Sequence, residues 1–180
     1  MRIVEGQTDK LDDVIEVLHG HRQVISCLSS FEPPHNSMSL LTENIVTAAE
    51  RMDSPDIRFI AYSLCGVEPD GDRLSHAIQS TLRVFSPGKF GPAINDHKEV
   101  IGILSKSQLN YTLFQTATMV NKRQGENYVS GSPSRCPGAR LWHRWGVLDA
   151  ADVCLSALAQ SELRRLQMRY VPGESVENSL

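Results

Sequence analysis

The sequence alternates short, continuous apolar runs with segments whose apolar residues recur at helical spacing. The runs are Val24–Leu28 and Ile57–Ser63, and Leu109–Thr116 is a further β-like segment. Between the first two, the apolar residues of 38–52 recur every three or four positions, as on one face of an amphipathic helix. Strands that are apolar throughout are typical of a parallel sheet covered by helices on both faces. The sequence therefore predicts one α/β domain over residues 1–170, followed by a flexible tail over residues 171–180.

Weaker local signals complete this prediction. Residues 2–5 favour a strand, 11–18 and 149–158 favour helices, and 121–140 form a polar, Gly- and Pro-rich segment expected to be a loop. Gly20 follows the first helical segment and is expected to end it. Asp96 and Glu99 have the spacing of a capping box, which predicts that a helix begins at Asp96.

Composition excludes several classes of function. The chain has 180 residues, with 18 Lys and Arg against 21 Asp and Glu, so its net charge of −3 offers no general attraction to nucleic acids or anionic membranes. Neither a signal peptide nor a bilayer-spanning apolar run is present, which favours a cytoplasmic protein. The cysteines, at positions 27, 65, 136 and 154, have no metal-binding spacing. We therefore expect free thiols, with no metal site.

Several short motifs follow one another in an order that is characteristic of one family. They are Leu18–Gly20, Glu43–Ala49, Arg58–Ser63, Asn95–His97, Leu109–Thr112 and Val147–Val153. Through them the chain resembles, over nearly its whole length, the NAD(P)-binding atypical short-chain dehydrogenases of the NmrA-like and biliverdin/flavin reductase group. The resemblance implies a Rossmann-like fold, with three αβα layers around a parallel sheet.

The beginning of the family pattern has no counterpart in this sequence. The family opens with a strand, a Gly-rich turn, a helix and a second strand, and the turn holds the cofactor's pyrophosphate. Met1 matches the start of the third strand, and Gly6 is the only glycine before Gly20. We therefore expect an N-terminally truncated fold with weakened NADP(H) binding. We also expect the exposed edge at Val24–Leu28 to pair either with residues 2–5 or with a second copy of the chain.

The resemblance also assigns roles to individual residues. Ser63 matches a hydroxyl residue that contacts a carbonyl substrate or the nicotinamide. His97 matches an acid–base position that is usually Lys, and is His in the biliverdin/flavin reductase subgroup. Residues at positions that line the cofactor in the family are Gln7, Leu28, Ser29 and Thr116. Among these, Gln7 stands where relatives often carry an Asp that reaches the adenine.

Each assignment has an ordinary structural alternative. Ser63 can simply cap a strand end, and His97 can face solvent in the first turn of a helix. The Trp142–Trp145 cluster, with two indoles around two basic side chains, either holds a planar or anionic ligand or pins a loop by aromatic packing.

Several functions are consistent with these observations. The first is an NAD(P)H-dependent oxidoreductase for a small carbonyl, quinone or flavin-like substrate, in which Ser63 polarises the acceptor and His97 supplies a proton. The second is a cofactor-free binding or regulatory protein on the same fold, and the third is a non-redox isomerase or cyclase. A fourth alternative is that the sequence is an incomplete copy of a longer protein that carries the Gly-rich unit.

Overall fold

The computed structural model describes residues 3–30, 35–53, 56–64, 67, 77, 80–81, 84–85, 87–116, 118–121, 128–131, 144–160 and 166–172. Its main sheet has five strands in the order β1-β2-β3-β7-β5. The strands are β1 (Gln23–Ser26), β2 (Arg58–Leu64), β3 (Asn110–Thr116), β7 (Leu166–Pro172) and β5 (Tyr128–Gly131). All neighbours are parallel except β5, which is antiparallel to β7. The predicted parallel α/β sheet is confirmed.

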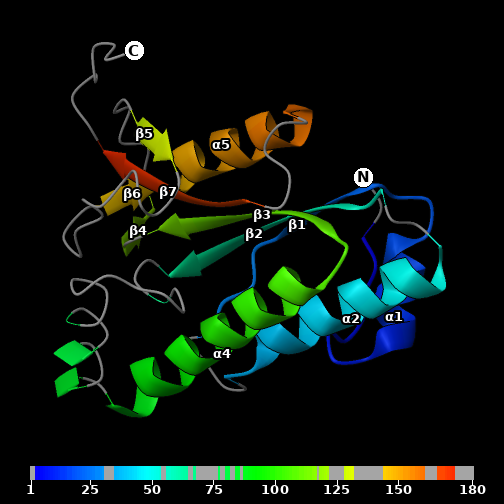
Figure 1. Ribbon diagram of the computed structural model, residues 1–180, viewed down its shortest axis with the longest axis horizontal. Coiled ribbons are helices and arrows are strands. Elements are labelled where there is room, and N and C mark those ends of the chain that lie inside the picture. The colour runs from blue at the N-terminus through cyan, green and yellow to red at the C-terminus, as the bar shows by residue number, and fades with distance from the viewer. Residues whose placement is uncertain are drawn as a thin grey trace.

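Helices cover both faces of this sheet (Figure 1). The helices on one face are α1 (Leu11–Leu18), α2 (Ser37–Arg51) and α4 (Pro87–Lys106), and α5 (Val147–Ala159) lies on the other. Two short strands, β4 (Thr118–Val120) and β6 (Arg144–Gly146), form a separate parallel pair. The arrangement is therefore the expected three-layer αβα structure.

Strand β2 supplies side chains to two hydrophobic cores because successive residues of a strand point to opposite faces. Phe59 and Ala61 are buried in the larger core, with apolar residues of α1, α2 and α4. Ile60 is buried in a smaller cluster with Cys154 and Ala157 of α5. The same alternation directs Ser63 toward α4, which matters for the site described below.

The short helix α1 follows directly from its sequence pattern. Val14 and Leu18 are buried, while Asp12 and Asp13 lie in the first turn. The Asp13 carboxylate accepts a hydrogen bond of 2.8 Å from the Gln7 backbone N–H. Beyond the helix, Gly20 has a φ of +79°, a left-handed conformation that glycine adopts without steric cost. The predicted end of this helix is confirmed.

The predicted start of α4 at Asp96 is wrong. The helix begins at Pro87, and Asp96 lies within it with 3% of its surface exposed. Proline is well tolerated in the first helical turn, since it has no N–H to leave unpaired there. The Asp96–Glu99 spacing imitates a capping box because residues one turn apart share a helix face anywhere along the helix.

The N-terminal segment also differs from the prediction. Residues 3–5 form no strand, and Ile3 is 82% exposed. The predicted strand over 2–5 and its pairing with the Val24–Leu28 edge are therefore wrong for the residues described. In that part of the chain β1 pairs with β2 alone and forms one edge of the sheet. Pairing of this edge with a second copy of the chain stays a prediction.

Near the C-terminus the sheet is more extensive than expected. Strand β5 lies within the predicted loop 121–140, and β7 extends to Pro172, two residues into the predicted tail. Trp142 and His143 lie outside the described residues, as do residues 173–180.

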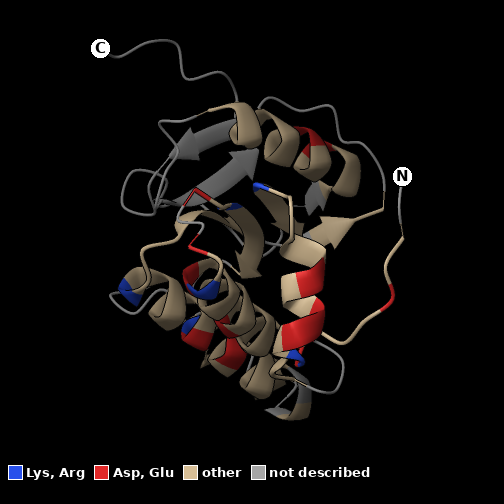
Figure 2. Ribbon diagram, turned by 90° about the vertical axis from the view of Figure 1, so that its right-hand side faces the viewer, with Lys and Arg blue, Asp and Glu red and all other residues tan. Residues whose placement is uncertain are grey.

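Among the residues that are coloured in Figure 2, Lys, Arg, Asp and Glu lie mainly on the helices. Strands β1 and β3 contain no Lys, Arg, Asp or Glu, and the single charge in β2 is Arg58. None of the helices in the described ranges is both long and apolar enough to cross a membrane.

Candidate functional site

The structure brings together Ser63 and His97, which the sequence singled out as candidate catalytic residues. Ser63 lies near the carboxyl end of β2, and His97 is in the middle of α4, which packs over that strand. Ser63 Oγ and His97 Nδ1 are 3.2 Å apart, within hydrogen-bond distance. Only 3% of Ser63 and 5% of His97 is exposed. His97 therefore does not face solvent, which rules out its structural alternative.

Burial changes the protonation of His97. Desolvation lowers the pKa of His97 from 6.5 to about 4, and the nearby negative charge of Asp96 opposes this shift only in part. His97 is therefore neutral near pH 7. A neutral imidazole has one donor and one acceptor nitrogen, so either Ser63 donates to Nδ1 or Nδ1–H donates to Ser63.

Gln115 lies beside Ser63 on the neighbouring strand β3. Its Cα is paired in register with that of Ser63, and its side chain is fully buried. Paired residues of adjacent parallel strands point to the same face, so Gln115 belongs to the face that carries Ser63. The sequence prediction chose Thr116 instead, whose register partner is Leu64. The available signal was the position of Gln115 near the carboxyl end of a predicted strand.

Asp96 connects α4 to the beginning of α2. Its carboxylate accepts hydrogen bonds from the Ser30 hydroxyl, from the Met38 N–H at 3.2 Å and from the Ser39 N–H at 2.9 Å. The first N–H groups of a helix have no partner within the helix, and a carboxylate there is stabilised by the helix dipole. Asp96 thus caps α2 from a different helix.

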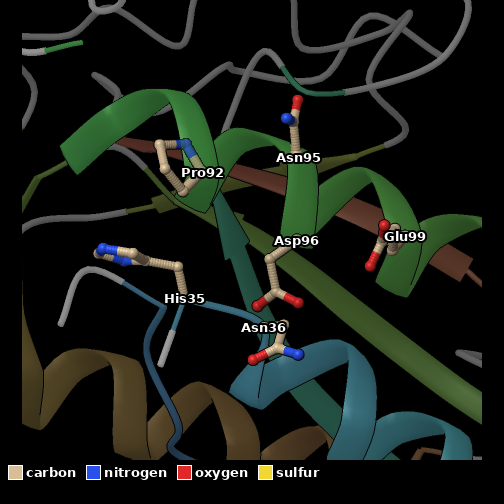
Figure 3. Close-up of a pocket in the computed structure, with 6 residues that line it drawn as sticks. All are labelled: His35, Asn36, Pro92, Asn95, Asp96 and Glu99. Carbon is tan, nitrogen blue, oxygen red and sulfur yellow. The ribbon is translucent and has the colours of Figure 1, made fainter. Parts of the chain in front are cut away.

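A cavity of about 320 Å³ lies beside this carboxylate, between α4 and the residues that lead into α2 (Figure 3). Its lining residues are His35, Asn36, Pro92, Asn95, Asp96 and Glu99. Figure 3 shows Asp96 pointing toward Asn36. His35 Nδ1 is 2.8 Å from the Ser30 carbonyl oxygen, which can only accept, so Nδ1 donates. Neither Ser63 nor His97 lines this cavity, so it is separate from that pair of residues.

The predicted cofactor-binding residues lie at several places. Leu28 and Ser29 follow β1, and Ser63 lies near the carboxyl end of the neighbouring parallel strand β2. All three residues therefore lie at the carboxyl ends of these strands. Leu28 packs against the larger core, and Ser29 is exposed. Gln7 is exposed before α1. Their roles toward a cofactor stay predictions.

A dinucleotide needs a cradle for its diphosphate as well as a place for its reacting ring. At the N-terminus of α2, the Asp96 carboxylate already accepts from a backbone N–H group. Just before α1, the Asp13 carboxylate accepts from the Gln7 N–H. At Gly6 an added Cβ would lie 3.2 Å from the Asp13 Cβ, so this glycine faces an acid. The described residues beside α1 and α2 therefore offer no cradle for the diphosphate.

Comparison with solved structures supports the fold. An oxidoreductase from Lactococcus lactis is 14% identical and superposes with a TM-score of 0.70 over 97% of this chain and 73% of its own. A short-chain dehydrogenase/reductase from Veillonella parvula, solved in complex with NADP, is 18% identical, with a TM-score of 0.63 over 98% and 76%. The anaerobillin reductase ChuY from Escherichia coli is 15% identical, with a TM-score of 0.65 over 96% and 76%. At these identities the similarity establishes the fold alone.

Sequence comparison defines the family. A search of curated proteins found no match. The sequence pattern of the NAD(P)H-binding family, in contrast, matches residues 1–161, which is most of the chain. The chain therefore belongs to the NAD(P)H-binding family.

Proposed function

We propose that this chain is an NAD(P)H-dependent reductase that acts on a small molecule with a carbonyl, quinone or flavin-like acceptor. The observation that carries the proposal is the 3.2 Å contact between Ser63 Oγ and His97 Nδ1 at the carboxyl end of a central parallel strand. Ligands of open α/β sheets bind at this end of the strands. Membership of the NAD(P)H-binding family supports the same conclusion. When bound, NAD(P)H supplies the hydride.

In this proposal Ser63 donates a hydrogen bond to the acceptor oxygen as negative charge develops on it. That role requires the Nδ1–H tautomer of His97, because Nδ1–H then donates to Ser63 Oγ and leaves the hydroxyl proton for the substrate. Since the pKa of His97 is about 4, the ring holds no stored proton near pH 7. His97 therefore relays a proton: as Ser63 protonates the acceptor oxygen, Nδ1 gives its proton to Ser63 Oγ, and Nε2 takes one from water that enters when the site opens.

The burial of Ser63 and His97 favours the proposed chemistry but restricts access for the substrate. A dry site strengthens the hydrogen bond that Ser63 makes to a developing oxyanion. A substrate, however, reaches this hydroxyl only if the structure around it opens, because only 3% of Ser63 is exposed. The proposal therefore includes a local opening on substrate binding.

One observation favours an alternative function. In the described residues, the Asp96 carboxylate occupies the N-terminus of α2, and the Asp13 carboxylate accepts from the Gln7 N–H just before α1, so neither place is open to a diphosphate. A cofactor-free protein on the same fold, either a binding protein or an isomerase or cyclase, is consistent with that arrangement. The two functions differ in whether the chain oxidises NAD(P)H.

Substitution of Ser63 tests the proposed reductase. We expect Ser63→Ala to lower kcat about 100-fold with little change in KM, because an oxyanion donor acts mainly in the transition state. The assay follows NADPH and NADH oxidation with a small quinone, an aromatic aldehyde and free flavin as acceptors. Ser105→Ala is the matched control, since the exposed Ser105 hydroxyl donates only to the Gly102 carbonyl on the far part of α4.

The pH profile adds an independent criterion. A neutral relay gives a kcat that is flat between about pH 5.5 and about pH 8.5, whereas a stored imidazolium proton gives a break near the ordinary histidine pKa. Wild-type turnover that Ser63→Ala leaves unchanged would contradict the role of Ser63. The absence of turnover with every acceptor would favour the cofactor-free alternative.

A further inference from the structure

We infer that Asp96 is a positioning residue, which holds His97 against Ser63 by fixing α4 to the N-terminus of α2. The inference rests on the proposed function for its catalytic consequence. The contacts that carry it are geometric and do not depend on the identity of the substrate.

Helix α2 takes its N-terminal cap from α4. Asn36, the residue at the ordinary capping position, makes no side-chain cap hydrogen bond. Asp96 supplies it instead, accepting from the Ser39 N–H at 2.9 Å through one oxygen and from the Met38 N–H at 3.2 Å through the other. These are charge-assisted hydrogen bonds, and Asp96 is only 3% exposed, so water does not compete for them.

The same carboxylate also binds the segment that follows β1. The hydroxyl of Ser30, a fully buried residue, donates to the Asp96 oxygen that also accepts from Met38. Ser30 in turn accepts a hydrogen bond from His35 through its backbone carbonyl. Asp96 is therefore fixed by the α2 backbone and by the segment that follows β1, rather than by one flexible side chain.

Asp96 and His97 are adjacent on α4, so the orientation of one determines the orientation of the other. Successive residues of an α-helix are rotated by about 100° around its axis, since there are about 3.6 residues per turn. With Asp96 directed toward α2, His97 is directed toward β2, where Ser63 lies. The cap thus sets both the rotation and the height of α4 at the turn that carries His97. A shift of about 1 Å there would break the hydrogen-bond distance to Ser63.

An Asp96 that served stability alone would have a different signature. Its loss would lower the melting temperature without changing the environment of the His97 nitrogens. The experiment therefore compares Asp96→Ala and Asp96→Asn with Ser107→Ala, a variant just beyond the C-terminal end of the same helix. The buried Ser107 hydroxyl donates to the Leu104 carbonyl and accepts from the Leu109 N–H, so its loss also destabilises α4 locally.

The primary measurement is the nitrogen chemical shifts of histidine in the full chain, labelled with nitrogen-15, with His97→Gln used to assign the His97 signals. We expect Asp96→Ala to move these signals toward those of a mixture of tautomers, Asp96→Asn to move them less, and Ser107→Ala to leave them unchanged. In the kinetic assay we expect kcat to fall about tenfold for Asp96→Ala, with KM little changed.

The outcomes separate this inference from the proposed function. If His97 shifts respond to Asp96 while the wild type turns over no NAD(P)H, the positioning role holds and the reductase proposal fails. If folded Asp96→Ala keeps wild-type His97 shifts and kcat, the inference is overturned. Should Asp96→Ala not fold, Ser30→Ala removes only the hydroxyl donor and supplies the same comparison, with unchanged His97 shifts again counting against the inference.

Discussion

Acidification from about pH 7 to about pH 4 will lower the free energy of unfolding through His97 alone by on the order of 3 kcal/mol. The folded state holds the pKa of His97 at about 4, whereas the ordinary value is 6.5. Between these values the unfolded chain binds a proton that the folded chain does not. The contribution of His97 is therefore fully present above about pH 6.5 and is lost as the pH falls toward about 4.

The measurement is urea unfolding of the wild type and of His97→Gln at several pH values. Because carboxylates also titrate on acidification, the informative quantity is the difference between the two proteins. We expect the wild type to lose more stability than the variant between about pH 6.5 and about pH 4. His19→Gln, which changes an exposed histidine, should follow the wild type. Parallel curves for wild type and His97→Gln would show that His97 is not buried as a neutral group.

Replacement of Arg58 will also destabilise the fold, by about 3 kcal/mol for Arg58→Ala. Arg58 is only 7% exposed. Its guanidinium donates to the Thr112 hydroxyl, to the Asn110 side chain at 3.5 Å and to the Ala157 carbonyl at 3.4 Å. Ala157 lies in the last turn of α5, where a cation is favoured by the helix dipole. Removal of Arg58 leaves buried acceptors on β3 and α5 without this donor.

Arg51→Ala is the control for this experiment, because Arg51 is exposed in the last turn of α2. We expect it to change the free energy of unfolding by less than about 0.5 kcal/mol. Both variants are measured by urea unfolding at neutral pH. Equal stability of Arg58→Ala and Arg51→Ala would mean that Arg58 does not join α5 to the sheet.

The elements that were predictable from the sequence are those with an unambiguous apolar pattern. The apolar stripe of α2 and the continuous runs in β2 and β3 gave the parallel sheet and its covering helices. Strand β7, in contrast, has apolar residues separated by Gln167 and Arg169, a pattern that also fits an extended tail. The two β7 residues that lie in the predicted tail, Val171 and Pro172, pair with β5, which is a tertiary contact that the local sequence does not reveal.

The candidate site was predictable in part. The resemblance selected Ser63 and His97, which lie 34 positions apart and meet in the structure. It did not reveal that Asp96 caps α2, because the local pattern around Asp96 favours a cap for its own helix and the true partner is 57 positions away. Gln115 was missed for a related reason, since its neighbour across the sheet depends on strand register.

Calorimetric titration of the 180-residue chain with NADPH and, separately, with NADH measures whether the chain binds the cofactor of the proposed reaction. We expect saturable binding with one dinucleotide per chain and a Kd below about 1 mM, weaker than a complete diphosphate cradle would give. A folded sample that gives no binding heat and no thermal stabilisation at about 10 mM of either dinucleotide would contradict the assignment of NAD(P)H-dependent reduction to this chain.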